Sequence, residues 1–346
     1  MYRETRRRLL AWSGLIVISA LVTVALMLTV AHFVGETPEL PTAETSYLAR
    51  TGQSCLGHVP DVDVEPSEVW RSHWKRLEEV DCKPGSWLYQ FREQGQNLAQ
   101  YQQDQPNMGH ADSHLLLIPL GRMHEPQHAA LVEPVREFVG LFFQRDAELG
   151  ATRELPLEAF HADKGRLGQF DAEQILEDLV GTCPGTAAAC MAITDRDLFV
   201  DKLQYVFGLG HFRKRVGVFS TYRLWEDRYN PLTDRDEPVR APEPLRRALK
   251  VAVHEMSHEF SVAHCVHDRS CILGGTNSLA ESDAGSLMLC PLDHAKLQWN
   301  LGFDPHQRFS GLADFAEHHG LHPEARYWRR LAREYPAYAN ASAGGN

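Results

Sequence analysis

The sequence HEMSHEFSVAH, residues 254–264, is the stretch that most constrains the fold and chemistry of this chain. Pro242 and Pro244 precede it, and apolar residues recur at helical spacing up to and through it, at Leu245, Leu249, Ala252, Met256 and Phe260. Proline is favoured in the first turn of a helix, and an apolar stripe of this period marks one buried face. We therefore expect a helix that begins near Pro242 and ends near Phe260.

Three histidines of this stretch form a candidate zinc site. His254 and His258 lie four positions apart, so a helix places both side chains on one face. A turn after the helix can bring His264 back toward them, which gives the three protein ligands typical of a catalytic zinc. Zinc lowers the pKa of its bound water toward neutrality, and Glu255 stands beside the ligands as a general base. The pattern predicts a zinc-dependent hydrolase with Glu255 as its catalytic residue.

A second match to the same pattern, HEPQH at residues 124–128, has a different interpretation. Pro126 lies between its two histidines, and proline suits the first turn of a helix but not its interior. We expect His124 to precede a helix that begins here, so that it does not share a face with His128.

The region upstream of the motif alternates between short apolar runs and helical periodicity. We expect strands at residues 115–118, 188–193 and 215–224, and helices over 131–142 and 175–180. The strand at 215–224 fits two interpretations. It could lie at an edge of the sheet, where an extended substrate would pair with it, or it could be an ordinary interior strand.

The residues around the motif resemble those of the archaemetzincins, a branch of the metzincin zinc peptidases. The family pattern is H-E-x-x-H-x-x-G-x-x-H-C, then four residues and C-x-M, and later C-x-x-C. The corresponding residues here are HEMSHEFSVAHC (254–265), CIL (271–273) and CPLD (290–293). Upstream, the segments that also look like the family are GQF (168–170), TDRDLF (194–199) and VFGL (206–209). The resemblance covers roughly residues 114–299.

This resemblance implies an α/β (α+β) zincin-like fold, in which a twisted mixed sheet lies over the active-site helix. It implies that His254, His258 and His264 bind the zinc ion and that Glu255 is the base. It also implies hydrolysis of peptide bonds, with aminopeptidase activity as one form of it.

Two positions depart from the family pattern. The family glycine in the turn to the third ligand is Ser261 here, and a non-glycine residue with positive φ costs on the order of 1 kcal/mol. The family methionine, a hydrophobic floor under the ligands, is Leu273, a substitution that nearly conserves volume. Neither change removes a chemical group that the reaction needs.

The family's second zinc site, which four cysteines would normally build, is altered. Cys265, Cys271 and Cys290 are present, but Asp293 takes the fourth position and His294 follows it. A structural zinc held by three cysteines with either the aspartate or the histidine is chemically possible. The alternative is a disulfide such as Cys265–Cys271 that leaves Cys290 free, as an oxidising compartment would favour.

The N-terminus carries a predicted membrane anchor. Arg3, Arg6, Arg7 and Arg8 precede an apolar run, residues 9–34, that contains no Asp, Glu, Lys or Arg. The run is long enough to span a bilayer, and the arginines should stay on the cytoplasmic side. We expect an uncleaved signal anchor with the catalytic domain outside the cytoplasm, in the periplasm if the source is bacterial. A signal peptide cleaved near residues 29–31 would instead give a secreted form.

Export also bears on the four remaining cysteines. In an oxidising compartment cysteines tend to pair, and nearness in sequence favours the pairs Cys55–Cys82 and Cys183–Cys190.

The chain of 346 residues divides into four predicted parts. These are a signal anchor or transmembrane segment (1–35), a linker with a small N-terminal cap (36–105), the metallopeptidase domain (106–300), and an appendage of two short helices with a tail (301–346). The net charge of −11 argues against a general nucleic-acid-binding surface, because phosphates require neutralisation by Lys and Arg.

Three hypotheses of function follow. The first is a membrane-anchored zinc peptidase that acts on a peptide or protein substrate. The second is a zinc-loaded but catalytically silent protein that presents a peptide groove, which Ser261 and Leu273 motivate and the intact Glu255 opposes. The third is an amidase of cell-wall peptide, which the predicted location motivates. The sequence leaves the oligomeric state open.

Overall fold

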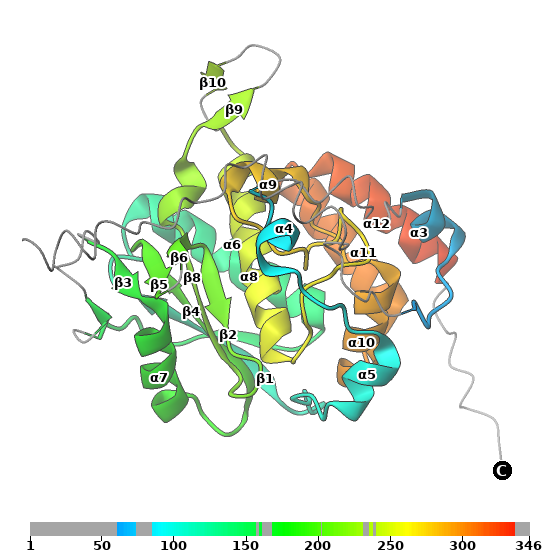
Figure 1. Cartoon of the computed structure of the whole chain (residues 1–346), viewed down its shortest axis with the longest axis horizontal. Coiled ribbons are helices and arrows are strands. Elements are labelled where there is room, and N and C mark those ends of the chain that lie inside the picture. Colours follow the sequence, from blue (N-terminus) through cyan, green and yellow to red (C-terminus); the bar gives the residue numbers. More distant parts are fainter. Residues whose placement is uncertain are drawn as a thin grey trace, which may run out of the picture. The chain divides into compact units, whose positions relative to one another are not determined.

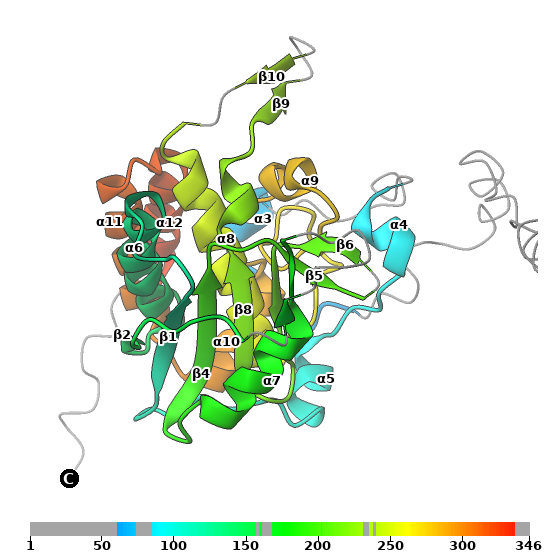
Figure 2. The ribbon, with the colours of Figure 1, turned by 90° about the vertical axis from the view of Figure 1, so that its left-hand side faces the viewer.

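The computed structural model describes residues 61–73, 85–156, 159–160, 168–201, 203–230, 235–237 and 240–335 (Figures 1 and 2). The predicted N-terminal anchor and the predicted pair Cys55–Cys82 lie outside these residues. Within the described part of the chain, no helix is both long and apolar enough to cross a membrane. The described residues all lie within one compact unit, residues 55–346.

A five-stranded sheet with the order β2-β1-β4-β8-β7 forms the centre of this unit. Its strands are β1 (His114–Leu120), β2 (Ala147–Leu149), β4 (Ala187–Thr194), β7 (Gly208–Gly210) and β8 (Val216–Ser220). Neighbouring strands are parallel except β7, which is antiparallel to β8. All eight residues of β4 are buried, as expected for a strand covered on both faces. The prediction of a mixed sheet is confirmed.

Helices cover both faces of the sheet. Helix α7 (Ala172–Thr182) lies on one face, and α6 (Pro126–Phe143) and α8 (Glu243–Glu259) lie on the other (Figure 1). Each face has its own apolar core, and the larger one is on the side of α6 and α8. The predicted mixed α/β architecture, with the active-site helix against the sheet, is therefore present.

The remaining elements surround this layered centre. A small sheet contains β3 (Phe170–Asp171), β5 (Leu198–Val200) and β6 (Leu203–Val206), and a hairpin contains β9 (Arg228–Asn230) and β10 (Arg235–Glu237). A 3₁₀ helix, η3, spans Tyr222–Trp225. The other helices are α3 (Glu68–His73), α4 (Trp87–Phe91), α5 (Leu98–Gln103), α9 (Leu279–Ala284), α10 (Pro291–Leu301), α11 (Pro305–His318) and α12 (His322–Glu334).

Most predicted elements are present with longer bounds. The strand predicted at 115–118 continues through Pro119 in β1. The helix predicted at 175–180 is α7, which begins at Ala172 with Asp171 as its N-cap and continues past Gly181. The strand predicted at 215–224 is shorter: β8 ends at Ser220 and η3 follows. Because β7 pairs with the outer side of β8, β8 is an interior strand and β7 is the edge.

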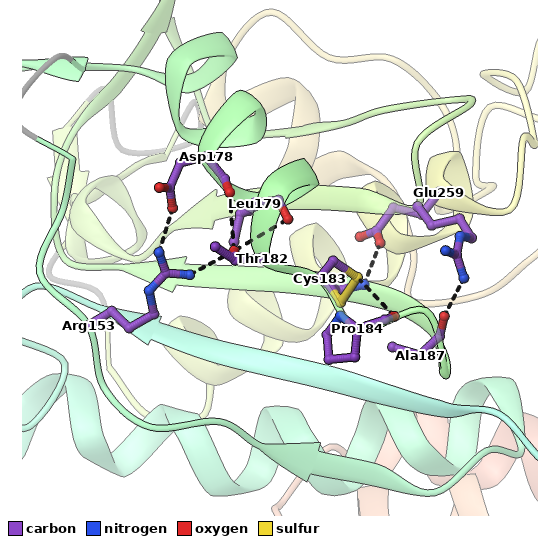
Figure 3. The surroundings of a disulfide bond; sticks show 10 residues. Arg153, Asp178, Leu179, Thr182, Cys183, Pro184, Ala187 and Glu259 are labelled. Atoms are coloured by element: carbon purple, nitrogen blue, oxygen red, sulfur yellow. Dashed lines mark hydrogen bonds and ion pairs between the residues drawn. A yellow bond between two sulfur atoms is a disulfide. The ribbon is translucent and has the colours of Figure 1, made fainter.

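The predicted disulfide Cys183–Cys190 is formed (Figure 3). It links the residue after α7 to the buried strand β4. On the other side of β4, the backbone N–H of Cys190 donates to Glu259 Oε2 at the end of α8. Cys190 of β4 thus connects to α7 through the disulfide and to α8 through this hydrogen bond.

The terminal regions of this unit contribute to the same core as the active-site helix. Trp70 and Tyr101, before the sheet, belong to the apolar cluster that contains Met256 of α8. Phe309 and Trp328, from α11 and α12, belong to it as well. The predicted N-terminal cap and C-terminal appendage therefore both supply buried residues to the centre of the unit.

Candidate active site

The helix α8 carries the first part of the predicted motif. It begins after Pro242, contains Pro244 in its first turn, and ends at Glu259 with Phe260 as its C-cap, close to the predicted bounds. Leu249, Ala252 and Met256 are completely buried, so the apolar stripe faces the core. This packing fixes the rotation of α8 and thereby the direction in which the motif side chains project.

The structure brings His254, His258 and His264 together. The Nε2 atoms of His254 and His258 are 3.1 Å apart, and those of His254 and His264 are 3.2 Å apart. Zinc–nitrogen bonds of 2.0–2.1 Å in tetrahedral geometry would place two nitrogen ligands about 3.3 Å apart. The spacing of these three rings therefore fits one zinc ion.

The hydrogen bonds of the three rings support the same interpretation. Each Nδ1 has an oxygen acceptor: Ile272 O for His254 (2.8 Å), Val262 O for His258 (2.7 Å) and Glu93 Oε1 for His264 (2.7 Å). Neutral rings that donate from Nδ1 direct their Nε2 lone pairs at one another, an arrangement that a cation stabilises. Burial, together with the neighbouring histidine rings, lowers the pKa of His254 to about 3 and that of His258 well below its usual value. Both are thus neutral, as metal ligands must be.

Glu255 is buried between α8 and the edge strand. A Cβ atom on Gly208 would lie 2.5 Å from Glu255 Cγ, and one on Gly210 would lie 2.2 Å from the Glu255 carbonyl oxygen. The two glycines of β7 are therefore needed for the strand to approach the helix. Burial raises the pKa of Glu255 to about 8, although the backbone of Gly210 opposes the shift. A nearby divalent cation would favour the ionised form.

A cleft of about 550 Å³ opens over these residues. One wall consists of residues 203–210, including the edge strand β7. His254, Glu255 and His258 of α8 line the cleft from below, together with His264 from the turn after the helix. Trp87 and Gln90 of α4 and the loop around Asn277 complete the lining. The three histidines and Glu255 thus face the same solvent-accessible space.

The turn between the second and third histidines contains the first departure from the family pattern. Ser261 has φ of 64°, the left-handed conformation in which the family has glycine. Its hydroxyl donates to Phe212 O at 2.6 Å and accepts from the N–H of Asn107 at 3.0 Å. These two hydrogen bonds offset the strain of the backbone.

The second departure, Leu273, lies in a completely buried position. Its carbonyl accepts from Cys265 N, and the preceding carbonyl of Ile272 accepts from His254. The segment therefore positions a ligand through its backbone, which the exchange of methionine for leucine leaves intact.

The three remaining cysteines converge with Asp293. The ligating atoms of Cys265, Cys271, Cys290 and Asp293 all lie within 4.8 Å of one another, and all four residues are buried. Cys265 Sγ and Cys290 Sγ are 3.7 Å apart, close to the roughly 3.8 Å that zinc–sulfur bonds of 2.3 Å would give. All three cysteines are free thiols, so the alternative disulfide is not formed.

His294, the other predicted fourth ligand, lies away from this cluster. Its ring is stacked on Phe309 and contacts the edge of Trp70. Asp293 lies at the third position of α10, where its backbone N–H donates to Cys290 Sγ. The helix thus turns Asp293 toward the sulfur atoms and His294 toward the aromatic core.

Two charged residues contact these sites without having been assigned a role there from the sequence. Glu93, from the segment after α4, accepts from His264 although the two are 171 positions apart in sequence. Lys296 Nζ is 2.8 Å from Asp293 Oδ1, and both side chains are buried. Burial alone would lower the pKa of Lys296, but the Asp293 carboxylate outweighs it and raises that pKa. The spacing of Asp293 and Lys296 on a predicted helix could have revealed their pairing; nothing local could have revealed Glu93.

The second H-E-x-x-H sequence is not part of the site. Helix α6 begins at Pro126, so His124 precedes it, as predicted. His128 is buried, and its Nδ1 forms a 2.9 Å hydrogen bond with Thr221 Oγ1.

Comparison with known proteins gives this site a family. Residues 168–298 match Peptidase family M54. An archaemetzincin of Pyrococcus furiosus is 30% identical over 190 residues, which are 54% of this chain and 94% of that protein. The chain belongs to the archaemetzincin family. Archaemetzincins are zinc metallopeptidases, so this chain is a zinc-dependent peptidase.

Other archaemetzincins match over different shares of their length. Human archaemetzincin-2 is 31% identical over 164 residues, which are 42% of this chain and 45% of that protein. The crystal structure of an archaemetzincin from Methanopyrus kandleri has a TM-score of 0.45 and 27% identity over 56% of this chain and 99% of that chain.

Proposed function

We propose that this archaemetzincin hydrolyses peptide bonds in the cleft, with His254, His258 and His264 as zinc ligands and Glu255 as the catalytic base. The observation that carries the proposal is the convergence of three Nε2 lone pairs beside a buried carboxylate that faces the same cleft. When bound, zinc lowers the pKa of a water molecule and polarises the substrate carbonyl. Glu255 accepts the proton of the attacking water and delivers a proton to the leaving amine.

The edge strand β7 is the best candidate to bind the substrate backbone. It forms part of the cleft wall, and among the described strands it pairs on one side only, with β8. An extended peptide could add to its other side and place its scissile bond over the histidines. The edge position belongs to residues 208–210 and not to the predicted strand at 215–224.

The test of the mechanism is Glu255→Ala in the full chain. Loss of a general base typically lowers the rate about 10²- to 10⁴-fold, and the variant should retain zinc because its three ligands are unchanged. Digestion of a peptide library by the wild type identifies the best substrate, and the hydrolysis rates of both proteins on that substrate give the loss of rate. Metal analysis of the variant gives its zinc content. Undiminished hydrolysis by a zinc-loaded variant would show that another group is the base.

The same library separates the remaining alternatives. Substrates with free and with acetylated N-termini distinguish an aminopeptidase, which cleaves only the former, from an endopeptidase. A silent binding protein would cleave nothing, and a cell-wall amidase would release new amines from purified wall material but leave ordinary peptides intact.

We further propose that Cys265, Cys271, Cys290 and Asp293 hold a second, structural zinc ion. The convergence of three buried thiols and one carboxylate supports it, and the buried cation of Lys296 would offset part of the negative charge of that ligand set. Metal analysis of the purified full chain should then give two zinc ions per chain, and one ion would reject this site.

The N-terminal anchor remains our proposal for localisation. It is supported by the four arginines that precede the uncharged apolar run at 9–34. Fractionation of expressing cells should recover the full-length chain with the membranes, accessible to protease from outside the cytoplasm; a soluble full-length chain would contradict it.

A further inference from the structure

The clamp segment, residues 93–107, contacts the turn that leads to the third histidine. It precedes the region that matches Peptidase family M54. We propose that the clamp segment is a working part of the metal site and that Glu93 is the positioning residue for His264. This inference rests on the proposed function, because it takes His264 to be a zinc ligand.

Glu93 determines which nitrogen of His264 faces the site. Glu93 Oε1 accepts a hydrogen bond from His264 Nδ1 at 2.7 Å, and the two side chains are only 26% and 18% exposed. Donation from Nδ1 leaves the Nε2 lone pair free to bind an ion, and a carboxylate partner increases the basicity of a ligating imidazole. The two histidines of α8 donate instead to backbone carbonyls, so His264 alone of the three relies on a side chain.

The clamp segment also binds the backbone of the turn. Phe260 O accepts from the hydroxyl of Tyr101 at 2.7 Å, and Glu259 O accepts from Nδ2 of Asn107 at 2.8 Å. Oε1 of Gln96 accepts from Ala263 N at 3.3 Å. These side chains satisfy backbone groups that the end of α8 and the following turn would otherwise leave to water. The path of the chain from His258 to His264 is thus held along its length.

Ser261 shows that the turn and the clamp segment fit each other. Its hydroxyl connects Asn107 of the clamp segment to Phe212, in the loop after the edge strand. Glycine, the family residue at this position, could form neither hydrogen bond. The departure from the family pattern therefore occurs at the residue where the clamp segment meets the turn.

Trp87 fixes the segment from its upstream end. The indole ring lies edge-on to the His264 ring with 5.1 Å between ring centroids. It also packs onto Gly275, where a Cβ atom would lie 2.3 Å from the indole. The backbone N–H of Trp87 donates to Glu281 of α9. In Figure 1, α4, just upstream of the clamp segment, lies in front of α8, and α5, within the clamp segment, lies beside α10.

The test compares zinc affinity in full-length variants. Competition with a chromophoric chelator measures the zinc dissociation constant of the histidine site, and cobalt–thiolate absorption reports any ion at the cysteine cluster separately. Glu93→Ala should raise the dissociation constant about 10- to 100-fold. Glu93→Gln keeps an oxygen acceptor for His264 and should recover part of the affinity. Glu65→Ala, at a 92% exposed carboxylate in the same terminal region, should bind zinc as the wild type does.

A purely structural role would give a different result. Glu93→Ala would then lower the stability of the zinc-free protein and leave the dissociation constant of the folded protein unchanged, and that outcome overturns the inference. His264→Ala distinguishes a wrong role for Glu93 from a wrong assignment of His264 as a zinc ligand. If it weakens zinc binding and Glu93→Ala does not, only the role of Glu93 is wrong. If it also leaves zinc binding unchanged, the ligand assignment and the proposed function are both wrong.

Discussion

The two candidate metal-binding clusters of this protein are built in opposite ways. The cysteine cluster is buried, and its members, together with Lys296, come from residues 265–296. The histidine cluster opens into a cleft, and the side chain that orients its third ring comes from Glu93. A structural site can be made from one local segment and closed to solvent, whereas a catalytic site has to leave room for substrate. One of its three ligands, His264, is held by a side chain from a distant part of the chain, and the other two donate to nearby backbone carbonyls.

The largest expected difference between the clusters is their response to a chelator. Brief exposure to a chelator should remove the ion of the histidine cluster and lower peptidase activity more than about 100-fold, because the zinc supplies several kcal/mol of transition-state stabilisation. The ion of the buried cysteine cluster should stay bound. One equivalent of zinc should restore activity, and metal analysis at each stage follows both ions.

Loss of both ions at the same rate would contradict this comparison. It would mean that the cysteine cluster exchanges with solvent as readily as the cleft does.

The next largest effect concerns the charge balance of the cysteine cluster. Lys296→Met removes the cation beside the buried Asp293 carboxylate, and breaking a buried ion pair costs about 3–5 kcal/mol of unfolding free energy. Urea unfolding of the zinc-loaded protein measures the loss. Lys214→Met, at an exposed lysine, is the matched control and should change stability by less than about 0.5 kcal/mol.

This variant also tests whether the clusters are independent. At a temperature where Lys296→Met remains folded, its catalytic rate should equal that of the wild type. Wild-type stability in Lys296→Met would show that the ion pair contributes nothing to the cluster.

The two clusters also differ in how far the sequence predicts them. His254, His258 and His264 are predicted correctly to converge because a helix and one turn, both encoded locally, bring them together. The sequence does not decide between Asp293 and His294 as the fourth member of the cysteine cluster. Adjacent residues on a helix project about 100° apart, so the start of α10 at Pro291 decides which of them faces the sulfur atoms.

Long-range contacts account for what the sequence does not predict. Glu93 reaches His264 only through the folded path of the chain, and no spacing rule links positions 171 apart. The edge strand β7 is a similar case. It has only three residues, two of them glycine, so its composition does not predict a strand. Its position beside the cleft depends on the close approach of these glycines to Glu255 in the folded chain. The strands β1, β4 and β8, the helices α6, α7 and α8 and the disulfide Cys183–Cys190, in contrast, follow from local patterns.

The smallest expected effect concerns Ser261, where the clamp segment meets the turn. Ser261→Ala loses two hydrogen bonds, each worth about 0.5–1.5 kcal/mol, and keeps the strained backbone. Ser261→Gly loses the same bonds but relieves roughly 1 kcal/mol of strain, so it should be the milder change. Chemical unfolding of both zinc-loaded variants should therefore rank wild type above glycine and glycine above alanine. An alanine variant as stable as the wild type would show that the hydroxyl does not bridge the clamp segment and the turn.

The central claim is that His254, His258 and His264 bind one zinc ion next to Glu255. Anomalous scattering at the zinc absorption edge, from crystals of the full chain, tests it most directly. We predict a peak about 2.0–2.1 Å from Nε2 of each of the three histidines. A zinc-containing crystal without a peak at that position would contradict the account.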